Sequence, residues 1–74
     1  MIEVHAGEIV EVKDGETVIV LEGGQANVRK GGHAEVRKGG RATVRNGGQA
    51  EIHNGGTATV LRGGDVEVYE GGQA

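Results

Sequence analysis

The apolar residues of this chain recur at every second position within a unit of eight residues. We number the unit as an octad whose place one is its first glycine. Place four then holds alanine or valine, and place six holds valine or isoleucine. Places three, five and seven are mostly Gln, Glu, Thr, Arg, His and Asn. Alternation with a period of two is typical of a half-buried strand, so each octad predicts a β-strand of about five residues and no helix.

Glycines separate the predicted strands. Place one is glycine nine times, at Gly7, Gly15, Gly23, Gly31, Gly39, Gly47, Gly55, Gly63 and Gly71. From Gly23 onward a second glycine follows at place two, which gives the repeat GGxAxVxx. A tight corner needs backbone dihedral angles that glycine adopts at low cost. We therefore expect a three-residue corner at places eight, one and two.

Two kinds of strand connection fit this period. In an antiparallel meander, pairs such as Asp14-Gly15 and Asn46-Gly47 would form hairpin turns. A two-residue turn would set each valine beside a polar residue, and a three-residue turn would leave one apolar face uncovered. In a parallel β-solenoid, identical octads stack in ladders and every corner repeats. The sequence therefore favours an all-β parallel solenoid, or β-helix, over the meander.

The number of octads per turn follows from how the core is filled. Two octads place small place four opposite larger place six, which gives a core of constant thickness. Three octads would make a triangle with edges of roughly 20 Å, which alanine and valine underfill. Two octads per turn are favoured over three, and an intertwined trimeric β-helix is a further alternative. With two, His53 stacks between Arg37 and Tyr69; with three, Gln25, Gln49 and Gln73 would share a column.

The pattern predicts one repeat domain over residues 1–74, with atypical units at 1–22 and regular repeats at 23–74. Glu8 and Glu16 replace the second glycine in the first two full octads. Large apolar residues also stand at outward places near both ends. These departures indicate either end caps or a surface that another chain covers. The candidate self-association residues are Ile9, Ile19, Leu21, Leu61 and Tyr69.

Composition limits the alternatives. Tyr69 is the only aromatic residue, there is no cysteine, and 16 glycines raise the entropic cost of folding. The small core predicts burial against further copies, as a trimer or an end-to-end stack. A net charge of −3 with interspersed signs argues against nucleic-acid and membrane partners. No apolar run is long enough for a signal peptide or a membrane span.

Candidate chemistry is sparse. His5, His33 and His53 are expected to be solvated, because no carboxylate or motif accompanies them as a metal or catalytic site requires. The paired glycines lack the Lys-Ser/Thr of a phosphate loop. We expect no catalytic residue, no metal and no cofactor. A basic strip of Arg29, Arg37 and Arg45 is the candidate partner-binding face, suited to an acidic glycan or protein.

The Gly-Gly units with alternating small and β-branched residues, from Gly23 to Ala74, resemble the passenger repeats of autotransporter adhesins. That resemblance implies a right-handed β-helix at an extracellular location. The chain also resembles calcium-binding β-roll repeats, but their required Asp is replaced here by Asn27, Glu35, Thr43, Glu51 and Thr59. The eight-residue unit resembles the three-chain β-helix of phage tail spikes, which would imply a virion protein.

Together these observations favour a non-enzymatic, self-assembling β-solenoid rod or spike segment. An adhesin-type module that binds a glycan or protein on an outer face is the alternative. A designed repeat scaffold is a further one, because the octads are so regular. The chain carries no targeting segment that would give its location.

Overall fold

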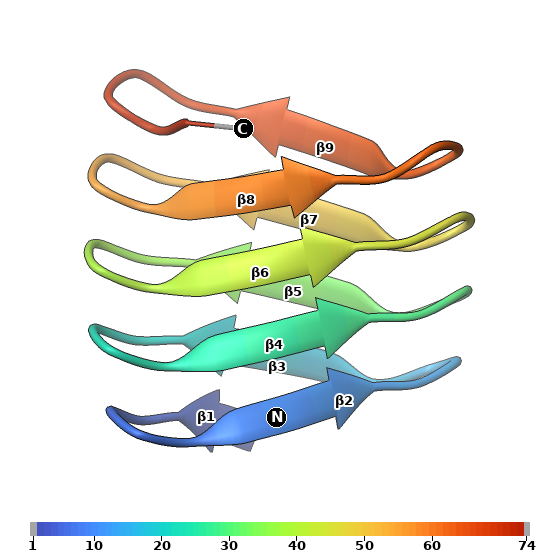
Figure 1. The fold of residues 1–74 in the computed structure, drawn as a ribbon, viewed down its shortest axis with the longest axis horizontal. Helices are drawn as coiled ribbons and strands as arrows, with labels where there is room; N and C mark the ends of the chain where they lie inside the picture. Colours follow the sequence, from blue (N-terminus) through green and yellow to red (C-terminus); the bar gives the residue numbers. More distant parts are fainter. Residues whose placement is uncertain (1, 74) are drawn as a thin grey trace.

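The structure is a computed structural model that describes residues 2–73, and it is a stack of flat coils (Figure 1). Each coil contains two strands that run in opposite directions and lie in different sheets. The strands are β1 (Ile2–Val4), β2 (Ile9–Val12), β3 (Thr17–Val20), β4 (Gln25–Val28), β5 (His33–Val36), β6 (Arg41–Val44), β7 (Gln49–Ile52), β8 (Thr57–Val60) and β9 (Asp65–Val68).

The strands form two parallel sheets. The odd sheet has the order β1-β3-β5-β7-β9, and the even sheet has the order β2-β4-β6-β8. Pairing joins residues 16 apart, as in Ala34↔Ala50 and Val28↔Val44. The parallel solenoid with two octads per turn is confirmed. The meander and the three-octad turn are wrong, because every pairing is parallel and none has a 24-residue offset.

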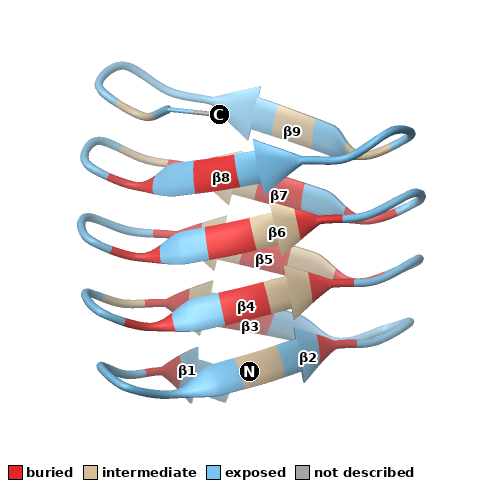
Figure 2. Cartoon of the chain, in the orientation of Figure 1, coloured by how far each residue is buried: buried red, intermediate tan, exposed pale blue. Residues whose placement is uncertain are grey.

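The core lies between the two sheets and consists of ladders of like residues (Figure 2). Places four and six point inward from both sheets, so small and larger side chains alternate across the core. No polar or charged residue is buried among residues 2–73. The buried hydrophobic residues are Val4, Val12, Val18, Val20, Ala26, Val28, Ala34, Val36, Ala42, Val44, Ala50, Ile52 and Ala58. One chain therefore encloses this core by itself, without the interwoven chains of a trimeric β-helix.

Each corner is a four-residue turn from place seven to place two. In the corner after β4, the Gly32 N–H donates to the Arg29 carbonyl at 2.9 Å, and Gly31 has a φ of +80°. A positive φ at the third residue with this hydrogen bond is the pattern of a type II turn. Strands β2 to β9 have four residues instead of the expected five, because place seven already begins the turn.

The two glycines of a corner serve different purposes. The first adopts the positive φ, whereas the second has no positive φ and lies against the coil below. A Cβ on Gly32 would lie 2.7 Å from the Val12 carbonyl oxygen, and one on Gly24 would lie 2.6 Å from that of Val4. Real Cβ atoms do not approach so closely. The second glycine therefore sets the spacing between coils.

Hydrogen bonds continue through the corners. The Gly31 N–H donates to the Gly47 carbonyl of the coil above at 3.0 Å, and the Arg29 N–H donates to the Val12 carbonyl below at 2.8 Å. Corners and strands thus belong to one ladder along the stack. Residues 2–73 include no helix long and apolar enough to cross a membrane.

Candidate functional site

The two sheets present different chemistry to solvent. The outward places of the odd sheet carry five carboxylates, on Glu3, Glu35, Glu51, Asp65 and Glu67. Within the strands of the even sheet, the outward residues carry one carboxylate, on Glu11, and one guanidinium, on Arg41. Its other outward side chains are mainly amides and hydroxyls. The odd sheet is therefore acidic. The even sheet is rich in hydrogen-bonding groups, and Lys13, Arg29 and Arg45 follow its strands at place seven.

A column of glutamates runs across the odd sheet. The strand register pairs Glu35 with Glu51 and Glu51 with Glu67. Like charges on neighbouring strands are destabilising. Arg37 relieves part of this repulsion through an ion pair with Glu35, in which both side chains are partly exposed. Glu51 has no cationic partner among residues 2–73, which leaves the middle of the column acidic.

His53 and Tyr69 lie beside this column, one coil apart. Their ring centroids are 4.7 Å apart, and the ring planes meet at 77° in an edge-to-face contact. Arg37 occupies the same column one coil below. This confirms the stacking of His53 between Arg37 and Tyr69. The His53 Nε2 atom lies 3.9 Å from Glu35 Oε2 and has no hydrogen-bond partner among residues 2–73.

Glu35, Glu51 and His53 are the described residues that could hold a metal ion together. Their ligand atoms lie within 4.8 Å of one another, and all three side chains are partly buried. Two carboxylates and an imidazole suit a divalent ion such as Zn²⁺, which binds its ligands at about 2.0–2.2 Å. The side chains would have to move inward, and Arg37 would have to release Glu35. In the sequence, the 16-residue spacing of Glu35 and Glu51 indicates that these two carboxylates lie on neighbouring strands.

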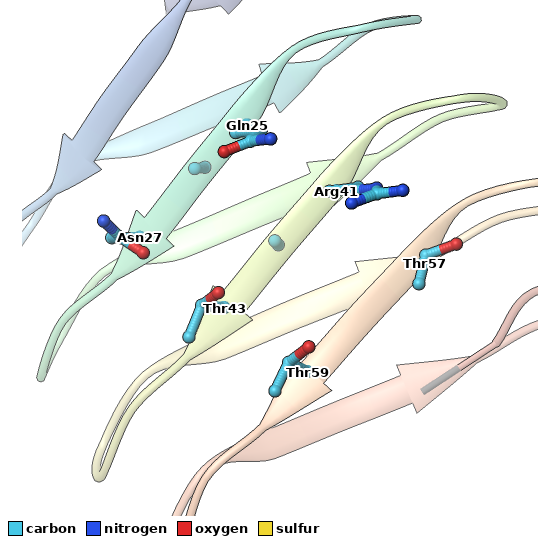
Figure 3. A pocket seen from close by; sticks show the side chains of 8 residues that line it. Gln25, Asn27, Arg41, Thr43, Thr57 and Thr59 are labelled. Atoms are coloured by element: carbon cyan, nitrogen blue, oxygen red, sulfur yellow. The ribbon is translucent and has the colours of Figure 1, made fainter.

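A shallow groove crosses the even sheet and has a volume of about 200 Å³. Figure 3 shows its polar side chains projecting from three neighbouring strands, β4, β6 and β8. Ala26 and Ala42 contribute to the lining between them. The polar lining residues are Gln25, Asn27, Arg41, Thr43, Thr57 and Thr59. The groove therefore offers both donors and acceptors, with one positive charge.

The structure separates the residues of the expected basic strip. Arg29 and Arg45 follow β4 and β6 of the even sheet, whereas Arg37 follows β5 of the odd sheet. Arg29 is held by Glu11 at 3.1 Å, and Arg37 by Glu35. An eight-residue spacing moves each successive residue to the other sheet, so residues 16 apart share a column. The arginine in the even-sheet groove is Arg41, which is not part of the expected basic strip.

The candidate self-association residues also fall into two groups. Ile9, Ile19 and Leu21 belong to the coils near the N-terminal end, whereas Leu61 and Tyr69 belong to those at the C-terminal end. Ile9 is 68% exposed, and Leu61 and Tyr69 are 40% and 44% exposed. These five residues do not form one continuous surface along the stack.

The fold defines this chain as a β-solenoid repeat protein. No family model matches its sequence, and no curated protein matches it. Among solved structures it is similar to the TibC-catalyzed, hyper-glycosylated TibA fragment 55–350, with a TM-score of 0.60 and 27% identity. The match covers 97% of this chain and 35% of that fragment, so the chain spans about a third of its length. The likeness supports the β-solenoid repeat fold of this chain.

The negative charge of the glutamate column should be measurable through the pKa of Tyr69, the single tyrosine of the chain. The Glu51 carboxylate raises the pKa of Tyr69 above 10.0, and desolvation, Glu67 and Glu35 act in the same direction. Because the raised pKa favours the neutral phenol in the folded state, this stabilisation is present below pH 10 and is lost as the pH rises through the folded pKa. An ultraviolet titration of tyrosinate should give a pKa above 10.

Glu51→Gln should lower that pKa towards 10, because it removes the largest cause of the shift. Glu11→Gln, on the even sheet, should leave it unchanged. Equal titration curves for the wild type and Glu51→Gln would contradict the placement of Tyr69 beside this column.

Proposed function

We propose that this protein is a non-catalytic structural segment, a rigid β-solenoid that lengthens coil by coil and assembles with copies of itself. The observation that carries the proposal is the unbroken 16-residue register from β1 to β9. Successive coils repeat the same contacts at the core and at the corners. The fold does not depend on one special residue, because each coil makes the same kinds of contact as its neighbours. That is the property of a modular scaffold.

The distribution of polar groups supports the same proposal. The core contains no buried polar residue among residues 2–73, and the ionisable groups lie at the surface, on the outer faces and in the corners. Chemistry is therefore restricted to shallow, open surfaces, where a catalytic group is poorly shielded from water. The adhesin-like solenoid of the structural neighbour is consistent with a structural role.

Changes of coil number test the structural proposal. Deletion of residues 31–46 removes one complete coil and rejoins the octads in phase, so we expect parallel β-structure and cooperative unfolding to remain. Duplication of the same residues should raise the midpoint of thermal unfolding, because each coil adds an interface with its neighbour. Circular dichroism during heating measures both effects.

Deletion of residues 31–42 is the matched control. It shifts the octads by half a unit and moves glycines into strands, so the folded signal should be lost. A chain that tolerates this deletion as well as the 16-residue one would contradict a scaffold built on register.

A second candidate function is glycan binding at the even-sheet groove. Amide and hydroxyl groups with a single guanidinium match a saccharide that carries a carboxylate or sulfate group. Arg41 lies at the middle strand of the groove, between β4 and β8. Because the only aromatic residue, Tyr69, lies on the odd sheet, no ring is available for stacking and the affinity should be weak.

Titration with sulfated and uronate-containing oligosaccharides, followed by amide chemical shifts, tests this second function. The chemical-shift changes should concentrate on β4, β6 and β8. Arg41→Gln should weaken the affinity for the oligosaccharide at least about tenfold, because a charge-assisted pair is lost. Arg37→Gln, on the odd sheet, is the control and should bind normally. Equal losses in the two variants would indicate nonspecific charge attraction and would contradict a groove site.

A further inference from the structure

The odd sheet brings a histidine ring next to its column of glutamates. Glu51 and His53 are two residues apart, and alternate residues of an extended chain point to the same face. Glu35 is the register partner of Glu51 on the neighbouring strand β5. The His53 N–H donates to the Val36 carbonyl at 2.9 Å, which ties His53 to the coil that contains Glu35. No local motif marks this meeting, because Glu35 belongs to the preceding coil.

The Nε2 atom of His53 lacks a partner in this cluster. It is buried from solvent and has no hydrogen-bond partner among residues 2–73. The Glu35 Oε2 atom lies 3.9 Å away, which is too far for a hydrogen bond. Most buried polar atoms in proteins do have a partner. A neutral imidazole nitrogen with a free lone pair is the commonest metal ligand in proteins. An ion between Nε2 and the two carboxylates would supply the missing partner.

The position of the His53 ring is fixed by its surroundings. Tyr69 packs edge-to-face against the ring, with centroids 4.7 Å apart. The Gly56 N–H donates to the His53 carbonyl at 2.9 Å and closes the turn that carries the ring. The His53 side chain is 30% exposed and that of Glu35 is 24% exposed, so neighbours restrict both. Ligands that are already oriented lose little entropy on binding.

The ligand atoms need only a small movement to coordinate an ion. Those of Glu35, Glu51 and His53 all lie within 4.8 Å of one another. Around a tetrahedral Zn²⁺ the donor atoms are about 3.4 Å apart, so each pair would close by at most about 1.4 Å. Changes in side-chain torsion angles can supply this movement while the backbone ladder stays as it is.

The charge distribution also favours a cation at this place. Glu51 lies between Glu35 and Glu67 in the register, and like charges on neighbouring strands repel. A divalent ion would neutralise the two carboxylates that bind it. Arg37 competes for Glu35, but its side chain is 52% exposed, so it can turn into solvent at low cost.

We propose that Glu35, Glu51 and His53 bind one divalent transition-metal ion, for which Zn²⁺ is the best match. Zn²⁺ accepts carboxylate oxygen and imidazole nitrogen together, and water can take the fourth position. Ca²⁺ and Mg²⁺ prefer six or more ligands that are all oxygen, so an imidazole suits them poorly. The ion joins the coils of β5 and β7. The site lies within one chain and does not depend on the self-assembly proposed above.

Calorimetric titration of the full chain with zinc chloride tests the site. The wild type should bind one ion with a dissociation constant of about 1–100 µM, because three ligands hold it at an open surface. His53→Gln and Glu51→Gln should each weaken binding at least about tenfold. His33→Gln is the matched control, since His33 lies on the same sheet beside Gln49 and should not contribute. Equal losses for His33→Gln and His53→Gln would overturn the assignment.

Arg37→Gln separates a built site from general attraction to an acidic face. It frees Glu35, so the affinity for Zn²⁺ should rise about tenfold. Arg45→Gln removes the same charge beside the even sheet and should change the affinity by less than about twofold. Equal gains in the two variants would show that net charge alone attracts the ion, which would overturn the site.

Nitrogen chemical shifts of the imidazoles give a direct measurement on the wild type, which remains decisive if a variant loses its fold. Zn²⁺ should shift Nε2 of His53 strongly and leave His5 and His33 nearly unchanged, whereas the same concentration of Ca²⁺ should not shift His53. Equal shifts of all three histidines would overturn the site. A folded chain that binds no Zn²⁺ up to about 1 mM would also overturn it and would leave the scaffold proposal intact.

Discussion

The contact between the second glycine of a corner, from Gly24 onward, and the backbone of the coil below is the constraint on which this structure depends. It lets the backbones of neighbouring coils approach closely, because a side chain at this place has no room. With the corners at that spacing, place-one N–H groups bond to the glycine carbonyls of the coil above. The alanine and valine ladders then stack in register between the sheets.

The 16-residue coil also determines what the surface can do. Alternate octads face opposite sides, so the outer residues of the two sheets can differ while the core repeats. In this chain one side collects glutamates, with His53 and Tyr69 beside them, and the other collects amides, hydroxyls and Arg41. A core filled by alanine and valine leaves no buried polar site among residues 2–73. Recognition must therefore occur on an outer face or at an end.

The amino-acid pattern was sufficient for most of the fold. Period-two alternation predicted the strands, and the preference of identical octads for stacking predicted a parallel solenoid with two octads per turn. It also predicted His53 between Arg37 and Tyr69. The strands were predicted one residue too long, because the turn hydrogen bond to the place-seven carbonyl has no signature in residue type. The expected basic strip combined residues eight apart, which a two-octad coil places on opposite sheets.

Other features required coordinates. The convergence of Glu35, Glu51 and His53 depends on side-chain directions that the repeat does not specify. The sequence left Glu8 and Glu16 open as end caps or contact residues, and their hydrogen bonds to His5 and Lys13 identify them as caps.

The most direct test of the central constraint is the free energy of unfolding of Gly32→Ala in urea. Gly32 lacks a positive φ, so alanine meets only the clash with Val12. The variant should lose about 1–3 kcal/mol from overpacking, whereas the exposed Gln49→Ala control should change by less than about 0.5 kcal/mol. Relief of glycine's entropy in the unfolded chain would by itself stabilise the variant by about 0.4–1 kcal/mol. A Gly32→Ala protein as stable as the wild type, or more stable, would contradict the account.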